Sequence, residues 1–355
     1  MSLLNRKEIP PFQKTLTVIL IGPLVLFLVG VLVHQVGAHS MESSVPISLN
    51  QAKYKSLLKE LQLEHGFDRQ ELEVLFKKAK FQTEIPEKFA KPAESRSYDA
   101  YRPLFIKPEI VQRGKLYLKE HQELFREVKE KYGVEPEVIA AILGVETKFG
   151  QRTHGGYSVF DALNSTFTGV PKRESFARKE LIHFLILSRE EQWDPLGIKG
   201  SYAGAMGIPQ FIPSSYRHFT VDFDHDGKRD LWLSEKDILA SVANYLKIHG
   251  WKEGAPIKLP LNGNPQKPSV QKLLREGMDA KTSVKTLKKA GIEMDNEKGT
   301  IDDNLEVSLM AYPTENGQER AVLFPNFRTI LTYNRAVNYA LVVSDLADLL
   351  REEPN

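Results

Sequence analysis

The feature that most restricts this chain is a run of nineteen uncharged residues near its start, residues 15–33. A helix of this length and apolar character just spans the hydrocarbon core of a bilayer. Arg6, Lys7 and Lys14 precede the run, and the next lysine or arginine is Lys53. Because basic residues remain on the cytoplasmic side, the pattern places the N-terminus in the cytoplasm and everything after the run across the membrane. The folded part of the protein must therefore form beyond that membrane.

The apolar run can act in two ways. We expect residues 15–36 to remain as a membrane anchor, because the run is longer than the apolar core of an ordinary cleaved signal peptide. The alternative is a long signal peptide that is cleaved near Ala38, after the small residues of "VGA". Both alternatives export residues 39–355.

Composition excludes several classes of protein. The chain has no cysteine, so a disulfide framework, a thiolate metal site, a cysteine nucleophile and a lipid-modified cysteine are all ruled out. A net charge of +2 without a long basic run gives no indication of a nucleic-acid partner. The sequence also lacks the P-loop, GxGxxG, HExxH and GxSxG motifs. We therefore expect no cofactor for the chemistry.

Helical periodicity dominates the exported part, so the predicted fold class is mainly α, with a small α+β part late in the chain. Helices are predicted over residues 47–66, 67–82, 107–133, 173–192 and 234–251, the second capped by Asp68. Short strands are predicted at 305–312 and 320–325. The expected organisation is an anchor or signal segment (1–38), a helical N-terminal region (39–133), a helical core (134–250), a small α+β subdomain (251–325) and a C-terminal helix that returns to the core (326–355).

Glu146 occupies an unusual place in the segment "AAILGVETKFG". Pro136 can begin a helix there, since a proline in the first turn loses no helical hydrogen bond. Apolar residues recur at helical spacing and put Glu146 on the apolar face, near the helix end; they are Val138, Ile139, Ile142 and Val145. One interpretation is a salt bridge at the helix end. The other is a proton donor, because an apolar setting raises the pKa of a carboxyl group.

Residues 200–216, "GSYAGAMGIPQFIPSSY", combine small residues with a few polar side chains. Small residues let a ligand or another segment approach the backbone closely. Ser201, Met206 and Gln210 could then contact a sugar, although a tight helix crossing uses small residues in the same way. Ser214 or Ser215 is the expected cap of the following helix.

The segment "DFDHDGKRDLW" begins like an EF-hand calcium loop. Its acidic residues fall at positions 1, 3, 5 and 9, with a glycine at position 6 and a lysine carbonyl available at position 7; the candidate ligands are Asp222, Asp224, Asp226, Lys228 and Asp230. Position 12 is Leu233, where a bidentate glutamate belongs. Glu235 could close the site instead, or the segment is simply a solvated acidic turn.

"TYNRAVNYA" brings Tyr333, Asn334 and Tyr339 close together. Aromatic rings with polar tips suit sugar faces. Packing against their own helix is the alternative use.

These motifs, in this order from about residue 100 to residue 345, resemble the lytic murein transglycosylases of the B type, exported bacterial enzymes that cleave the glycan of peptidoglycan. The resemblance implies a lysozyme-like helical core with Glu146 as the sole catalytic acid and base. It also implies substrate contacts from Ser201, Met206, Gln210, Phe211, Tyr245, Tyr333, Asn334, Tyr339, Tyr101 and Arg173. The acidic loop matches a metal-binding loop of the family, which suggests a structural Ca²⁺.

The family cleaves the β-1,4 bond between N-acetylmuramic acid and N-acetylglucosamine and forms a 1,6-anhydro sugar without consuming water. The resemblance implies the periplasm as the compartment, with glycan strands, the membrane and other cell-wall enzymes as candidate partners. A hydrolytic muramidase is the first alternative and needs a second carboxylate, for which Asp161 and Glu180 are candidates. A non-catalytic peptidoglycan-binding protein is the second.

Overall fold

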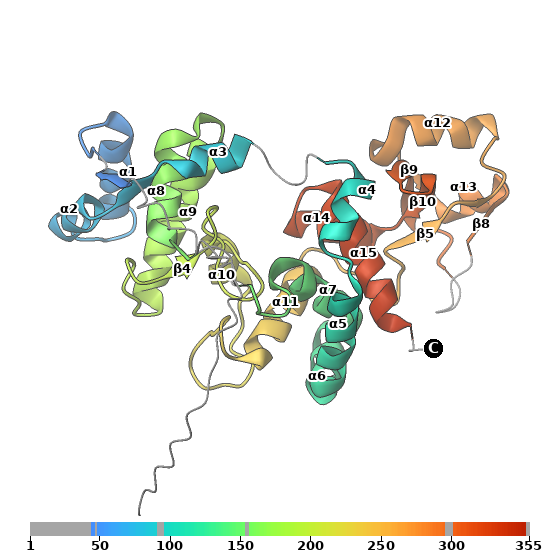
Figure 1. Cartoon of the computed structure of the whole chain (residues 1–355), viewed down its shortest axis with the longest axis horizontal. Helices are drawn as coiled ribbons and strands as arrows, with labels where there is room; N and C mark the ends of the chain where they lie inside the picture. Colours follow the sequence, from blue (N-terminus) through green and yellow to red (C-terminus); the bar gives the residue numbers. More distant parts are fainter. Residues whose placement is uncertain (1–43, 47, 91–95, 153–155, 295–300, 353–355) are drawn as a thin grey trace, which may run out of the picture. The chain divides into compact units, whose positions relative to one another are not determined.

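The structure is a computed structural model that describes residues 44–46, 48–90, 96–152, 156–294 and 301–352 (Figure 1). Mainly helical architecture with small sheets is confirmed. No helix among the described residues is long and apolar enough to cross a membrane. The expected anchor, residues 15–36, and the alternative cleavage point near Ala38 lie outside the described residues.

The first described part is a short antiparallel pair with three helices. Strand β1 (Ser44–Pro46) pairs with β2 (Lys80–Gln82), and the helices are α1 (Ala52–Leu63), α2 (Arg69–Lys77) and α3 (Glu84–Ala90). The Asp68 side chain accepts the Glu71 N–H at 2.9 Å, so the predicted cap is confirmed. The helix predicted to reach residue 82 ends earlier, because the backbone N–H of Lys80 donates to Asp161 and β2 forms instead.

The helix predicted over 107–133 is two helices, α5 (Pro108–Glu120) and α6 (Gln122–Tyr132), separated at His121. The break lets α5 pack on helices α7 (Pro136–Thr147) and α15 (Val337–Arg351), while α6 packs mainly on α11 (Glu235–Ile248). Periodicity runs through His121 and no proline or glycine stands there, so the pattern suggested one helix. The predicted end at Gly133 is right, with φ +70°.

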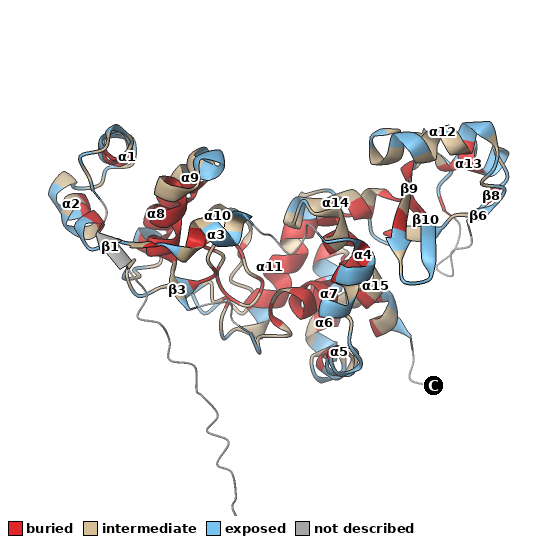
Figure 2. Ribbon diagram, turned by 45° about the horizontal axis from the view of Figure 1, so that its top comes forward, coloured by how far each residue is buried: buried red, intermediate tan, exposed pale blue. Residues whose placement is uncertain are grey.

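Helix α7 forms the centre of the core. From Val138 to Thr147 every residue except Glu146 is buried, because α5, α6, α11 and α15 surround the helix. Figure 2 shows α7 and α15 largely in the colour of buried residues. Helix α14 (Pro325–Tyr333) packs on α15, and the ring of its last residue, Tyr333, lies almost parallel to that of Tyr339 in α15.

A half-buried carboxylate fixes α15. Asp345 accepts hydrogen bonds from Tyr98 Oη at 2.6 Å and Arg102 Nε at 3.0 Å, and it pairs with Lys258 Nζ at 2.9 Å. Burial alone would raise the pKa of this carboxyl, but the three donors outweigh it and the pKa is lowered. These contacts connect α15 to α4 (Tyr98–Tyr101) and, through Lys258, to strand β5 (Lys258–Pro260).

Helices α8 (Val159–Gly169), α9 (Glu174–Glu190) and α10 (Pro213–Phe219) pack in sequence, with α9 between the other two. The prediction that Ser214 or Ser215 caps α10 is wrong. Ile212 is the N-cap residue and Pro213 begins the helix. The Ser214 N–H and hydroxyl both donate to Glu180 at 2.8 Å, so a neighbouring helix supplies the acceptor that a capping serine would have supplied.

The late part of the chain contains the predicted small sheet. Its antiparallel order is β5 (Lys258–Pro260), β10 (Gly317–Leu323), β9 (Glu306–Thr314) and β7 (Thr282–Ser283). Helices α12 (Pro268–Glu276) and α13 (Val284–Lys289) contact this sheet, and a separate cluster of buried residues such as Val284, Leu309 and Val322 forms its core. Two further two-stranded pairs are β3 (Tyr157–Ser158) with β4 (Lys199–Gly200), and β6 (Asn262–Gly263) with β8 (Ile292–Glu293). The domain boundaries expected from the sequence stay predictions.

Candidate active site

Glu146 lies in the last turn of α7, as the periodicity predicted. Its side chain is half-buried, whereas the apolar-face pattern suggested deeper burial. The difference arises because α7 is apolar around almost its whole circumference, and Glu146 marks the one place near its end where the helix reaches the surface. Tyr339, in the first turn of α15, donates a hydrogen bond from its hydroxyl to Glu146 Oε1 at 2.6 Å.

An aromatic group surrounds this hydrogen bond. The Tyr339 and Tyr333 rings lie 6.3 Å apart and almost parallel, at 9°, and the Tyr333 and Tyr245 rings lie 4.9 Å apart. Phe211 lies 5.7 Å from both Tyr245 and Tyr333. Burial raises the pKa of the Tyr339 and Tyr333 hydroxyls far above the usual value, and the charge of Glu146 raises it further. Both hydroxyls therefore keep their protons at neutral pH and can donate hydrogen bonds.

The segment rich in small residues docks beside Glu146. Thr147, the next residue of α7, donates its hydroxyl to the carbonyl of Ile208 at 3.0 Å. Tyr333 donates its hydroxyl to the carbonyl of Pro209 at 2.5 Å. The structure thus brings residues 206–211 and the tyrosines Tyr333 and Tyr339 to the end of α7.

Within this segment the polar side chains also hold the backbone. Ser201 Oγ accepts the N–H groups of Ala203 at 3.2 Å and Ala205 at 3.1 Å. Gln210 Nε2 donates to the carbonyl of Gly207 at 2.8 Å, and Met206 pairs with Phe211 through backbone hydrogen bonds. Ser201, Met206 and Phe211 are buried, and Met206 has no exposed surface, so contact of these three side chains with substrate stays a prediction.

The remaining candidates each contact neighbouring protein groups. Tyr101 is buried against Phe105, with ring centroids 4.9 Å apart. Asn334 Oδ1 accepts the Ala336 N–H at 3.0 Å and so shapes the turn between α14 and α15. Arg173 is exposed, and its guanidinium lies 4.8 Å from the centre of the Phe89 ring. Their contact with substrate stays a prediction.

Both candidate second carboxylates are engaged elsewhere. Asp161 accepts the Lys80 N–H at 2.9 Å and joins β2 to α8. Glu180 accepts two hydrogen bonds from Ser214 and joins α9 to α10. Both residues are more than nine-tenths buried, which suits these structural tasks and leaves little surface for a water molecule or sugar.

Three carboxylates converge at the acidic loop. Oxygens of Asp222, Asp224 and Asp237 lie within 4.8 Å of one another. Burial raises the pKa of Asp237, and the charges of the two other aspartates raise it further. Glu235, suggested from the sequence as the closing ligand, accepts the hydroxyl of Tyr117 instead. Sequence reasoning missed Asp237 as a candidate ligand because its position, beyond the twelve-residue loop, looked like an ordinary helix start.

The other aspartates of the loop shape its turns. Asp226 Oδ1 accepts the Lys228 N–H at 2.8 Å, and Asp230 Oδ1 accepts the N–H groups of Trp232 and Leu233. Their role as ligands, together with the Lys228 carbonyl, stays a prediction.

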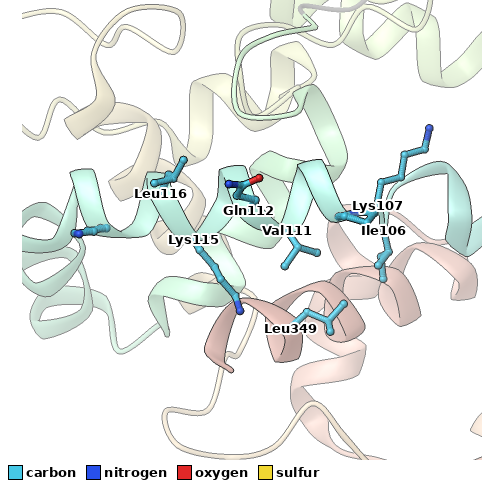
Figure 3. Close-up of a pocket in the computed structure, with 9 residues that line it drawn as sticks. Ile106, Lys107, Val111, Gln112, Lys115, Leu116 and Leu349 are labelled. Carbon is cyan, nitrogen blue, oxygen red and sulfur yellow. The ribbon is translucent and has the colours of Figure 1, made fainter. Parts of the chain in front are cut away.

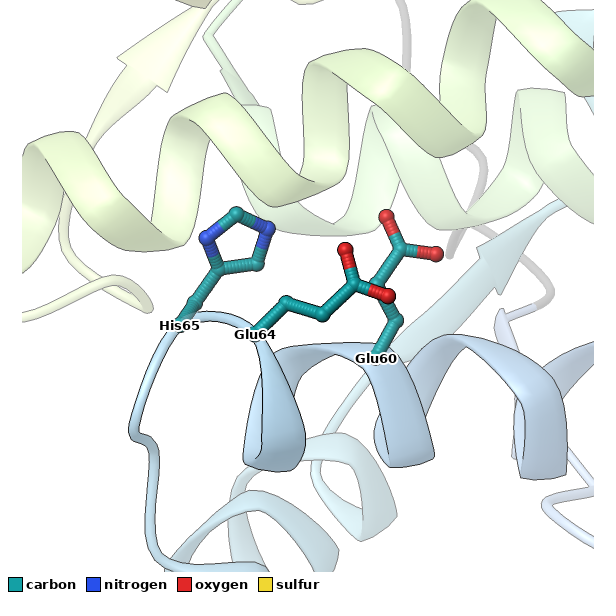
Figure 4. A group of neighbouring side chains, drawn as sticks. All are labelled: Glu60, Glu64 and His65. Atoms are coloured by element: carbon teal, nitrogen blue, oxygen red, sulfur yellow. The ribbon is translucent and has the colours of Figure 1, made fainter.

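Two further features of the described residues contain none of the predicted site residues. A second group of metal-ligand side chains, Glu60, Glu64 and His65, lies at the end of α1 (Figure 4), but Arg178 forms an ion pair with Glu60 there. An open hollow of about 750 Å³ lies along α5 (Figure 3); it is lined by apolar and lysine side chains that include Val111, Lys115 and Leu349.

Comparisons with known proteins agree with this geometry. The family described as the transglycosylase SLT domain matches residues 50–348. Membrane-bound lytic murein transglycosylase B of Escherichia coli (strain K12) is 37% identical over 292 residues, which cover 79% of this chain and 78% of that protein. Soluble lytic transglycosylase SltB1 of Pseudomonas aeruginosa matches with a TM-score of 0.75 and 38% identity over 83% of this chain and 97% of that one. Escherichia coli lytic transglycosylase Slt35, solved in complex with calcium, matches with a TM-score of 0.74 and 34% identity over 86% and 95%.

Proposed function

We propose that Glu146 is the single acid and base of this chain, which belongs to the transglycosylase SLT family and is a lytic transglycosylase of peptidoglycan. The hydrogen bond from Tyr339 to Glu146 Oε1 is the observation that supports this role most directly. A hydrogen bond of this kind holds the carboxyl group in one orientation, which a proton donor needs. The docked segment 206–211 and the tyrosines then supply contacts for the sugar chain.

The proposed reaction uses Glu146 twice. In the first step the carboxyl donates its proton to the glycosidic oxygen between N-acetylmuramic acid and N-acetylglucosamine, and the C1–O bond breaks. The N-acetyl group of the substrate stabilises the positive charge at C1. Glu146, now ionised and still bonded to Tyr339, takes the proton of the C6 hydroxyl as that oxygen attacks C1. The product is a 1,6-anhydro sugar, and no water is consumed.

Mass spectrometry of the sugars released from purified peptidoglycan tests this reaction. We expect products one water lighter than ordinary muropeptides, without a reducing end. Reducing products would instead identify a hydrolase and require a second carboxylate. The engagement of Asp161 and Glu180 in structural hydrogen bonds speaks against that alternative.

A structural Ca²⁺ fits the acidic loop. Hard cations take carboxylate and carbonyl oxygens, and Asp222, Asp224 and Asp237 offer oxygens close enough to share one ion. All three carboxylates also accept backbone N–H groups: Asp222 accepts those of Asp226 and Gly227, Asp224 accepts that of Asp226, and Asp237 accepts those of Phe223 and Asp230. The ion would offset the mutual repulsion of the three charges. The similarity to Slt35, which was solved in complex with calcium, supports the choice of metal.

Removal of the metal should affect stability before rate. We expect a chelator to lower the melting temperature by about 5 °C and calcium to restore it, because a ligand that binds only the folded state stabilises that state. Turnover measured well below the transition should change little. The Asp237→Asn variant should lose the response to calcium. An unchanged melting temperature in chelator would show that the loop holds no metal.

We infer that the protein works in the periplasm, attached to the inner membrane through residues 15–36. The uncharged run and the basic residues before it support this placement, and the Escherichia coli relative is named as membrane-bound. Cell fractionation tests it: the full chain should sediment with membranes, and a chain that begins at residue 39 should not. If cells that express the full chain yield a protein that is free of membrane and begins at or near His39, cleavage near Ala38 would be favoured.

A further inference from the structure

A small cavity of about 330 Å³ lies on the flank of the acidic loop, at the end of α9. It is lined by two aromatic and four charged residues: Glu191, Trp193, Lys228, Arg229, Asp230 and Trp232. We propose that this cavity is a second carbohydrate-binding site, which holds an uncharged N-acetylated sugar ring of the glycan strand away from Glu146. The choice of polymer rests on the proposed peptidoglycan activity, whereas the existence of the site rests on the geometry of the cavity itself.

Trp193 and Trp232 form one aromatic wall of the cavity, and neighbouring rings hold this wall in place. Trp193 and Trp232 are two of the three tryptophans in the chain, and both are half-buried. Their rings meet edge to face at 5.5 Å, and both rest on the fully buried ring of Tyr216, at 5.3 and 5.9 Å. Indole side chains held in this way offer apolar surface for the C–H face of a pyranose at little cost in conformational entropy.

The wall also has unused donors. A buried tryptophan N–H usually has a protein acceptor, as Trp251 shows by donating to Glu135 at 3.0 Å. Trp193 and Trp232 are only half-buried, and within the part of the chain that the structure describes neither Nε1 has a protein acceptor or belongs to the buried polar atoms without a partner, so both N–H groups are open to solvent. The exposed Lys228 ammonium forms no ion pair with the described residues. Three donors therefore remain for a ligand, and the acetamido carbonyl of an N-acetylated sugar is a matching acceptor.

The charges of the lining favour an uncharged ligand. Two carboxylates, Glu191 and Asp230, face two cations, Lys228 and Arg229, so the formal charges cancel. Arg229 is already engaged, since its guanidinium donates to Glu191 and to the carbonyl of Arg217. A phosphate or a free carboxylate would find little net attraction there, whereas sugar hydroxyls can donate to the carboxylates and accept from the donors.

The cavity is linked to the catalytic end of α7 through a single residue. Ile208 donates its N–H to the carbonyl of Leu231 at 2.8 Å, and Leu231 lies between the lining residues Asp230 and Trp232. The carbonyl of the same Ile208 accepts the hydroxyl of Thr147, the neighbour of Glu146. A glycan held in the cavity would therefore keep the polymer close to the acid between successive cuts.

Fluorine NMR of the full chain in detergent micelles, with 5-fluorotryptophan in place of tryptophan, tests the proposal. Three resonances are expected, assigned by the single variants Trp193→Phe, Trp232→Phe and Trp251→Phe. Titration with chitotetraose should shift the resonances of Trp193 and Trp232 saturably and leave that of Trp251 in place. The Trp232→Phe variant, which removes one donor, should weaken the affinity read at Trp193 by about threefold to tenfold, and Trp251→Phe should leave it unchanged.

Absence of any shift at Trp193 and Trp232, in a protein whose melting temperature shows it to be folded, would overturn the proposal. A shift caused by a peptidoglycan stem peptide and not by chitotetraose would also overturn it, because the cavity would then be a peptide site. The same titration on the Glu146→Gln variant separates this proposal from the catalytic one. Binding there should be retained whether or not Glu146 is the acid.

Discussion

Replacement of Glu146 by glutamine should abolish transglycosylase turnover, with a loss of about 10³-fold or more, while the fold stays intact. Glutamine has nearly the same shape, and its amide oxygen can accept the hydrogen bond that Tyr339 now donates to Oε1. It cannot donate a proton to the leaving oxygen or remove one from the C6 hydroxyl. The measurement is the rate of release of anhydro sugars from peptidoglycan, together with the melting temperature.

The matched control is Glu137→Gln, the same change in the first turn of the same helix, which should keep full activity. Tyr339→Phe supplies an intermediate case. It keeps the ring beside Tyr333 and removes only the donor to Glu146, so kcat should fall by about tenfold. If the Glu146→Gln variant still turned over peptidoglycan, the acid would have to be another residue and the proposed mechanism would be wrong.

The second large effect is expected from Gly207→Ala, which should destabilise the protein by about 2–4 kcal/mol and reduce activity as well. Gly207 has φ +70°, where a residue with a Cβ is strained, and the added Cβ would lie 2.7 Å from both the Cβ and the carbonyl oxygen of Leu231. That same carbonyl accepts the Ile208 N–H. Relief of the clash must therefore displace the backbone around Gly207 and Ile208. The carbonyl of Ile208 accepts the hydroxyl of Thr147, which is the neighbour of Glu146. Thermal or denaturant unfolding measures the first effect, and the release of anhydro sugars measures the second.

Gly254→Ala separates strain from the clash. Gly254 has φ +72°, almost the same backbone conformation, but nothing lies within 4 Å of an added Cβ. It should cost about 1–2 kcal/mol and leave activity unchanged. Equal destabilisation by the two substitutions would mean that contact with Leu231 contributes nothing and that the segment can shift freely.

Periodicity predicted several elements well. Helices α9 and α11 and the strands β9 and β10 match the predicted ranges closely, with only the terminal residues displaced. The failures have long-range causes. His121 interrupts a continuous pattern because α5 and α6 pack on different helices, and β2 is held by Asp161, which lies 81 residues beyond Lys80. Neither cause leaves a local trace in the sequence.

In the candidate site, too, some features have a local signal in the sequence and others depend on long-range contacts. Glu146 and the tyrosines could be predicted, because a carboxylate on an apolar helix face and a recurrent motif are local signals. The hydrogen bond between Glu146 and Tyr339 joins residues 193 positions apart, and the contact of Thr147 with Ile208 joins residues 61 apart. Asp237 joins the acidic loop only because α11 turns its first residues toward Asp222 and Asp224. Chain topology, and not residue type, brings these groups together.

Ser201 illustrates how a structural bond can decide chemical selectivity. A hydroxyl has two lone pairs and one proton. Both lone pairs of Ser201 Oγ are directed to the backbone, since the oxygen accepts the N–H groups of Ala203 and Ala205. Only its proton remains to offer, so a ligand group that reached this serine would be selected by polarity: a carbonyl or carboxylate oxygen would be favoured there, and an N–H or O–H group that comes as a donor would be disfavoured.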